Sequence, residues 1–254
     1  MGSIISTVAF PAPELPKSFY ENRLENRPDL VWLTTKKGEK IPACHIRARH
    51  PLPGPRFTII YSHGNAEDIG VHLEFIEALA EASCCDVLSY EYVGYSLSKL
   101  AGASASEKAC IRSIDAAYKY CTQNLRILPE HVILHGRSIG SGPTVDLASR
   151  VECRGVMLQS PIESGARVVF NTTVSYVGYP FDIFRNYEKV SKIKAPVAIM
   201  HGTADEVVPC DNGRALHKSL KMPFDPYWMD NYGHNNMPDH LCFRYLKSFI
   251  EHLR

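Results

Sequence analysis

A serine between two glycines joins a strand-like run to a helical run in the middle of the chain. The segment Gly136-Arg137-Ser138-Ile139-Gly140 follows the apolar run 131–135 directly, and a helical stretch over 144–150 comes after it. In this strand–turn–helix context the glycines permit a sharp turn that lifts the serine Oγ clear of the sheet. The N-terminus of the following helix favours negative charge beside it. The pattern predicts a nucleophilic Ser138; the alternative is a glycine-rich turn whose serine only caps a helix.

A serine hydroxyl is a weak nucleophile without a base, and two later loops carry suitable partners. Asp205 comes just after the strand-like run 196–201, and His234 follows the run 226–229. The chain order of serine, acid and histidine is the one expected with this type of turn. We therefore assign Ser138 as nucleophile, His234 as general base and then acid, and Asp205 as the group that orients the imidazole. The alternative carboxylates for this last role are Glu206 and Asp230.

Acyl transfer also needs two N–H groups to stabilise the oxyanion. The residue after the nucleophile, Ile139, is expected to supply one of them. The loop after an early strand supplies the other, and here the run 57–61 leads into Ser62-His63-Gly64-Asn65-Ala66. Asn65 is our choice for this donor, with Ala66 as the next candidate. We interpret His63 as a structural hydrogen-bonding residue beneath the loop and not as a catalytic one.

Short apolar runs alternate with helical stretches along the chain, which predicts an α/β fold with a mainly parallel central sheet and helices on both faces. The expected buried strands are 57–61, 86–90, 131–135, 155–159, 196–200 and 226–229. Before them, 30–35 and 41–48 predict a hairpin. Ser104 to Glu107 fits a capping box for a helix through Cys121, and 243–253 predicts a closing helix.

The interval between Ser160 and Ala195 is too long for a simple connection. Its aromatic residues are Phe170, Tyr176, Tyr179, Phe181, Phe184 and Tyr187. We expect residues 161–187 to form a short lid-like insertion or acyl groove; the alternative is an ordinary helix with packing aromatics.

Composition narrows the class of protein. The 254 residues carry a net charge of +1 without a basic run, which argues against a nucleic-acid partner. Eight scattered cysteines without a C-x-x-C pair indicate reduced thiols in a cytoplasmic chain. The dispersed histidines, without an H-E-x-x-H pattern, argue against a metal site, and the absence of G-x-G-x-x-G argues against a dinucleotide, so we expect no cofactor. No apolar run is long enough to cross a bilayer. We expect an N-terminal segment over 1–28 and one domain over 29–254.

Several motifs resemble a known family, the α/β-hydrolase domain-containing protein seventeen group. The similar segments, in chain order, are 61–66, 89–95, 138–140, 143–150, 201–207 and 233–235. The resemblance implies an α/β-hydrolase fold and a triad of Ser138, Asp205 and His234. Because known members remove palmitate from protein cysteines, it also implies a thioesterase acting on S-acylated proteins. The alternatives are a serine peptidase of the prolyl oligopeptidase clan, a small-ester carboxylesterase, and a non-catalytic interaction module.

The sequence departs from the family pattern in two places. Ser96 and Ser98 stand where the family usually carries glycine, and no cysteine precedes Cys44, whereas the family is anchored by palmitoylated N-terminal cysteines. Residues 1–6, Met-Gly-Ser-Ile-Ile-Ser, instead fit the N-myristoylation pattern, which predicts a lipid on Gly2. A single myristoyl chain binds membranes weakly, so we expect reversible association with the cytosolic face of membranes. The sequence predicts no particular oligomeric state.

Overall fold

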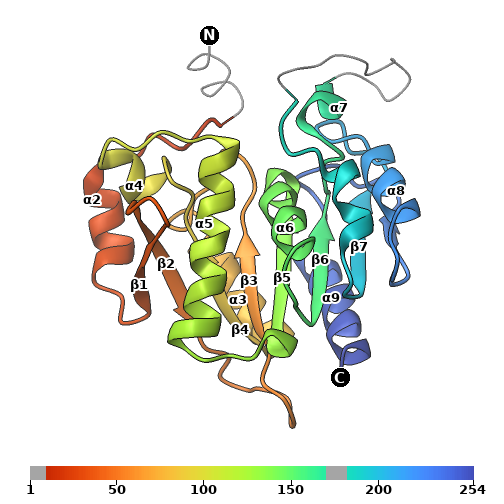
Figure 1. Ribbon diagram of the computed structural model, residues 1–254, viewed down its shortest axis with the longest axis horizontal. Coiled ribbons are helices and arrows are strands. Elements are labelled where there is room, and N and C mark those ends of the chain that lie inside the picture. Colours follow the sequence, from red (N-terminus) through yellow and green to blue (C-terminus); the bar gives the residue numbers. More distant parts are fainter. Residues whose placement is uncertain (1–9, 170–181) are drawn as a thin grey trace. The chain divides into compact units, whose positions relative to one another are not determined.

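The computed structural model describes residues 10–169 and 182–254. Gly2 lies outside these ranges, and so do four aromatic residues of the expected lid, Phe170, Tyr176, Tyr179 and Phe181. The chain groups into two compact units, residues 1–132 and 133–254 (Figure 1).

The first unit contains four strands in the spatial order β1-β2-β4-β3. They are β1 (Leu30–Thr34), β2 (Lys40–Ile46), β3 (Thr58–Ser62) and β4 (Asp86–Tyr90). β1 and β2 form the predicted antiparallel hairpin, β2 pairs antiparallel with β4, and β3 runs parallel to β4. Every residue of β3 and β4 is buried, as expected for strands covered on both faces.

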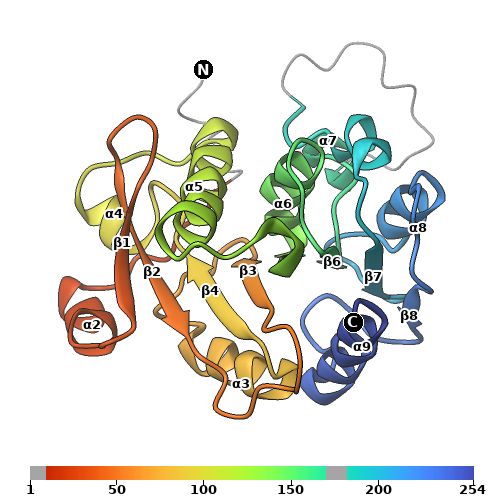
Figure 2. The same cartoon turned by 60° about the horizontal axis from the view of Figure 1, so that its bottom comes forward.

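Two long helices cover opposite faces of these strands, α3 (Leu73–Ser83) and α5 (Glu107–Lys119) (Figure 2). The shorter helical segments of the unit are α2 (Lys17–Tyr20), η1 (Glu21–Glu25), α4 (Ser96–Leu100), η2 (Tyr120–Asn124) and η3 (Pro129–His131). The expected capping box was wrong: Ser106, not Ser104, caps α5, and its side chain accepts a hydrogen bond from the Ala109 N–H. Helix α2 begins directly after Pro16, which occupies its N-cap position.

The second unit contains β5 (Val132–Arg137) apart from its first residue, and β6 (Gly155–Gln159), β7 (Val197–Gly202) and β8 (Tyr227–Met229). They lie side by side in chain order, and each pairs with its neighbour in parallel. Because parallel strands end at the same edge of a sheet, the loops that follow β5, β7 and β8 share that edge.

Helices α6 (Ser141–Ala148) and α9 (Asp239–His252) cover opposite faces of these strands (Figure 2). The remaining helical segments are η4 (Ser138–Gly140), α7 (Gly165–Val169), η5 (Asn186–Glu188), η6 (Val190–Lys192) and α8 (Asp211–Lys218). Both long helices begin earlier than the sequence predicted. In α6, Pro143 lies in the first turn, where its missing N–H costs no helical hydrogen bond.

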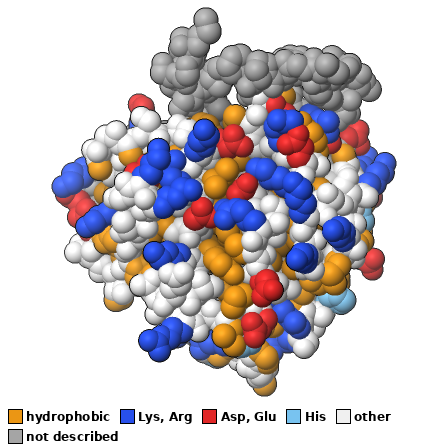
Figure 3. All heavy atoms as spheres, viewed as in Figure 1, with side chains coloured by type: hydrophobic (Ala, Val, Ile, Leu, Met, Phe, Trp, Pro, Cys, Tyr) orange, Lys and Arg blue, Asp and Glu red, His pale blue; other side chains and the backbone are white. Residues whose placement is uncertain are grey.

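The surface mixes charges of both signs. On the face drawn in Figure 3, Lys and Arg side chains lie among Asp and Glu side chains. Within residues 10–169 and 182–254, no helix combines the length and the apolar character that a membrane span requires.

Candidate active site

Ser138 lies at the turn between β5 and η4, directly at the carboxyl edge of the second unit's strands. Its backbone is in the left-handed region, with φ of 54°, which is rare for a residue with a side chain. Gly136 makes this turn possible, because a Cβ there would lie 2.5 Å from the Thr144 Oγ1 and 2.7 Å from the Gly140 carbonyl oxygen. The local sequence therefore holds a strained serine that is 7% exposed.

The structure brings Ser138, His234 and Asp205 together through two hydrogen bonds. The His234 Nε2 lies 3.0 Å from the Ser138 Oγ, and the His234 Nδ1 lies 2.7 Å from the Asp205 Oδ2. Since the carboxylate can only accept, Nδ1 carries the proton and Nε2 is free to accept the serine hydroxyl. This arrangement can take a proton from Ser138 as its oxygen attacks a carbonyl carbon.

Asp205 is fixed at both of its oxygens. Its Oδ1 accepts the Val207 N–H at 2.9 Å and the Val208 N–H at 2.7 Å, while its Oδ2 faces His234. Burial alone would raise the pKa of Asp205, but hydrogen bonds from His201, His234 and the Val208 N–H hold it well below its usual range. Asp205 is therefore ionised at neutral pH.

The alternative carboxylates lie elsewhere. Glu206 and Asp230 are both exposed, and the carboxylate in contact with His234 is that of Asp205. Sequence reasoning missed one neighbour, His201 near the end of β7, whose Nε2 is 3.3 Å from the Asp205 Oδ2. A polar residue in an otherwise apolar buried strand, four positions before the acid, is the signal that marks it.

The two expected oxyanion donors belong to different units. Ile139 follows Ser138 directly, in the first turn of η4. Asn65 belongs to the first unit, in the loop after β3, and its role as the second donor stays a prediction. In this loop Ala66 has a positive φ of 57°, so the turn directly after Asn65 uses the left-handed backbone conformation.

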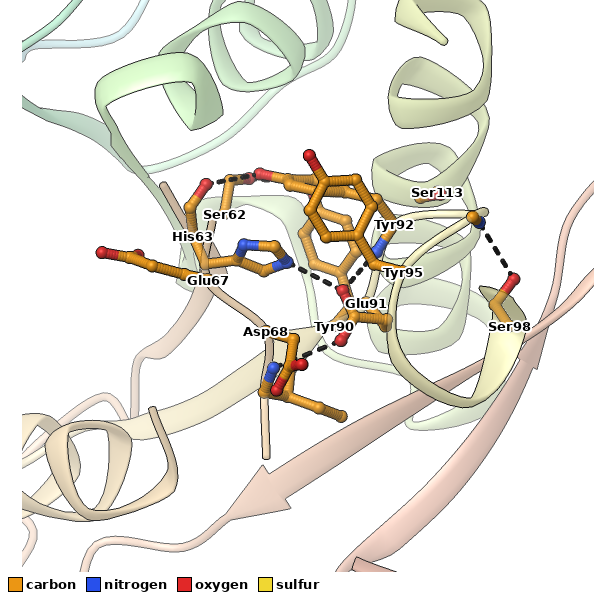
Figure 4. Close-up of polar contacts among 12 residues, drawn as sticks. Ser62, His63, Glu67, Asp68, Tyr90, Glu91, Tyr92, Tyr95, Ser98 and Ser113 are labelled. Carbon is orange, nitrogen blue, oxygen red and sulfur yellow. Dashed lines mark hydrogen bonds and ion pairs between the residues drawn. The ribbon is translucent and has the colours of Figure 1, made fainter. Parts of the chain in front are cut away.

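A buried polar cluster surrounds His63 and Glu91 (Figure 4), and one of its tyrosines also contacts Asn65. The His63 Nδ1 is 2.9 Å from the Gly64 carbonyl oxygen, and its Nε2 is 2.9 Å from the Glu91 Oε1. The Tyr92 hydroxyl donates to the His63 carbonyl at 2.8 Å, and the Tyr95 hydroxyl donates to the Asn65 Oδ1 at 2.9 Å. Burial favours a neutral imidazole, but the facing carboxylate outweighs it and raises the pKa of His63.

The two serines that replace family glycines have different roles. Ser96 is buried and has a positive φ of 47°, a conformation that glycine adopts without strain. Ser98 uses its Oγ to accept the Gly94 N–H at 3.2 Å, so its side chain stabilises the turn before α4. The glycine preference is thus explained at position 96, where this chain tolerates strain.

The cysteines are mostly buried, and burial raises the pKa of several of their thiols. All eight are free thiols, and six of them are buried. Burial raises the pKa of Cys44, Cys121 and Cys153 to about 12 and that of Cys242 to about 11, so these thiols are protonated at neutral pH. In the part of the chain that the structure describes, no three His, Cys, Asp or Glu side chains are grouped as a metal site would require.

The described ends of the expected lid pack on the second unit. Phe184 is fully buried, and its ring contacts α6 at Gly142, where any Cβ would collide with it. Tyr187 lies beneath the Arg167 guanidinium, 3.9 Å from the ring centre. These two aromatic residues are packing residues; the other four of the interval lie outside the described ranges.

Solved structures identify the class of fold. Est1E from Butyrivibrio proteoclasticus is similar to the chain with a TM-score of 0.68 at 18% identity, over 89% of this chain and 98% of that one. This similarity, with the strand–turn–helix around Ser138, defines an α/β-hydrolase fold, as predicted. No family model matches the chain.

Sequence relatives identify the family. The α/β hydrolase domain-containing protein 17C of Xenopus tropicalis is 39% identical over 219 residues, covering 86% of this chain and 68% of the relative. The protein 17C of Homo sapiens is 36% identical over 234 residues, covering 92% and 69%. The chain therefore belongs to the α/β hydrolase domain-containing protein 17 family, as its motifs predicted.

Proposed function

We propose that this α/β hydrolase is a serine hydrolase that cleaves acyl thioesters and removes palmitate from S-acylated cysteines of membrane-associated proteins. One observation carries the catalytic part: the 3.0 Å contact between the His234 Nε2 and the Ser138 Oγ, with Asp205 2.7 Å behind the same imidazole. The substrate part rests on the family resemblance.

Acylation begins when the Ser138 Oγ attacks the thioester carbonyl carbon and His234 takes the hydroxyl proton. The carbonyl oxygen becomes an oxyanion, which accepts hydrogen bonds from backbone N–H groups, one of them that of Ile139. The C–S bond then breaks, and the cysteine sulfur leaves with the proton that His234 held. The product of this half-reaction is an acyl ester on Ser138.

Deacylation repeats the sequence with water. His234 removes a proton from a water molecule, whose oxygen attacks the ester carbonyl carbon. The bond to the Ser138 Oγ breaks, the serine recovers its proton from His234, and the fatty acid is released. Water is the co-reactant of this second half-reaction, and His234 carries the proton in both.

The acyl substrate can be tested directly with a panel of matched compounds. Purified protein should hydrolyse long-chain acyl-cysteine peptides faster than the corresponding serine esters, and should leave the unmodified peptide intact. The measurement is kcat/KM across chain lengths, with Ser138→Ala as the blank. Faster turnover of short esters would favour the carboxylesterase alternative, and peptide cleavage would favour the peptidase.

We further propose that a myristoyl group on Gly2 brings this activity to membranes, supported by the pattern over residues 2–6. Gly2→Ala should move the protein from the membrane fraction to the supernatant without changing its turnover of a soluble substrate. Since one chain binds with only about 10⁴ M⁻¹, the wild type should itself partition between the two fractions. Equal partition of wild type and variant would overturn this part.

A further inference from the structure

His201 is a second imidazole that contacts the Asp205 carboxylate, at the same oxygen that faces His234. It is in β7, is fully buried, and its Nε2 is 2.8 Å from the Val208 carbonyl oxygen and 3.3 Å from the Asp205 Oδ2. Both neighbours are acceptors, so Nε2 carries a proton that they share. The oxygen that orients His234 therefore receives an N–H from each of two imidazoles.

The second ring nitrogen of His201 makes no hydrogen bond of this kind to any residue that the structure describes. Its Nδ1 is buried and, within the described parts of the chain, has no hydrogen-bond partner. A proton there would be a buried donor without an acceptor, which is costly. The ring lies against α8, where a Cβ on Gly213 would be only 2.6 Å from this Nδ1. The bare glycine leaves the space that the imidazole occupies.

His201 supports Asp205 by two routes. Directly, it donates to the Oδ2. Indirectly, its stronger bond holds the carbonyl of Val208, and the N–H of the same Val208 donates to the Asp205 Oδ1 at 2.7 Å. Removal of the imidazole N–H would release one side of the 205–208 turn and one contact of the carboxylate together.

We propose that His201 is a positioning residue of the active site, whose imidazole N–H holds the Asp205 carboxylate in the orientation in which it accepts the hydrogen bond of His234. The inference rests on the proposed function, because it assigns His201 a part in the same reaction. It adds a fourth side chain to the three that sequence order predicts.

The test compares His201→Phe, which keeps the ring and removes the N–H, with His201→Gln, whose amide can restore a donor. For the Phe variant we expect kcat to fall roughly ten- to a hundredfold, the scale of one charge-assisted hydrogen bond. KM should stay unchanged, because His201 acts through Asp205. His201→Gln should recover much of the loss.

A pH profile separates positioning from general packing. Without the His201 N–H, the Asp205 carboxylate has one hydrogen-bond donor fewer and stabilises a protonated His234 more strongly. The midpoint of the acidic limb of the kcat/KM profile should therefore move to higher pH by up to about one unit. The other ionisable groups nearby are the same in every variant, so they cannot produce the difference. They are Cys210, Asp211 and Arg214, which interact beside Asp205, Arg137, whose guanidinium donates to the Asn235 Oδ1, and the exposed Glu206 and Asp230 on the loops that carry Asp205 and His234.

His217→Phe is the matched control. His217 is another histidine of the second unit whose Nε2 faces a backbone carbonyl, that of Phe224 at 3.3 Å. It is partly buried, whereas His201 is fully buried, and it has no part in the Asp205 contacts described above. The His217→Phe variant should leave kcat and the pH midpoint of kcat/KM unchanged. If His201→Phe does not fold, Gly213→Ala displaces the same ring while keeping its N–H, and should lower kcat in the same way.

The outcomes distinguish this inference from the proposed function. Wild-type kcat and pH midpoint in His201→Phe, with an inactive Ser138→Ala, would overturn the role of His201 alone; for a variant that does not fold, wild-type kcat in Gly213→Ala would do the same. Full activity in Ser138→Ala would overturn the proposed function, and the inference with it.

Discussion

Ser138→Ala is expected to reduce kcat by roughly 10⁶-fold, the loss seen when a serine nucleophile is removed from a comparable triad. The bond from Ser138 to the acyl carbon cannot form without the Oγ, and His234 then has no hydroxyl proton to accept. The melting temperature should change little, because the strain at φ of 54° belongs to the backbone and an alanine retains it.

Ser160→Ala provides the matched control for this experiment. Ser160 is also buried, also follows a parallel strand of the second unit, and also has a positive φ, of 46°. Its replacement should leave turnover within a few-fold of wild type. A fluorophosphonate probe should label the wild type and Ser160→Ala but not Ser138→Ala. Equal labelling of all three proteins would show that Ser138 is not the nucleophile, and absence of labelling would favour an interaction module.

The sequence predicts the elements that hold the site because their signals are local. Strands β5 to β8 are short apolar runs bounded by polar loops, so their existence and order can be read from hydropathy. Parallel strands then place the residues after their carboxyl ends at one edge. This reasoning chose Asp205, in the loop beyond β7, over Asp230 at the strand end, and the structure puts the Asp205 carboxylate against His234.

The exact start of α5 could not be predicted, because Ser104 and Ser106 both fit the local N-cap pattern and the structure uses Ser106. Other features depend on contacts between residues far apart in the chain, which hydropathy does not report. The ring of His201 finds room only because Gly213, twelve residues later, brings a bare backbone against it. Likewise, Phe184 looked like part of a lid but fills the space beside Gly142.

Asp205→Asn is expected to lower kcat by about 10⁴-fold, as in comparable triads. The geometry explains why an isosteric change is so harmful. The Val207 and Val208 N–H groups require an acceptor at Oδ1, so the new amide must place its NH₂ at the Oδ2 position. That NH₂ would face the His234 Nδ1, which must then give up its proton. The proton moves to Nε2, and the imidazole can no longer accept from Ser138.

The variant should also lose stability, with a definite pH dependence. The folded-state pKa of Asp205 lies below that of an unfolded aspartate, so the ionised carboxylate stabilises the fold at neutral pH. This contribution is present above the unfolded pKa and disappears as the pH falls through the folded one. The stability gap between wild type and Asp205→Asn should therefore narrow on acidification, which denaturant titrations at several pH values can measure.

Asp230→Asn and Glu206→Gln are the controls for the role of Asp205. Both side chains are exposed, so their substitution should change neither kcat nor the stability by more than a small amount. If Asp205→Asn kept normal turnover while one of these two variants lost it, the orienting carboxylate would be reassigned to that residue. The hydrogen bond at 2.7 Å to His234 would then describe a resting arrangement that the reaction does not use.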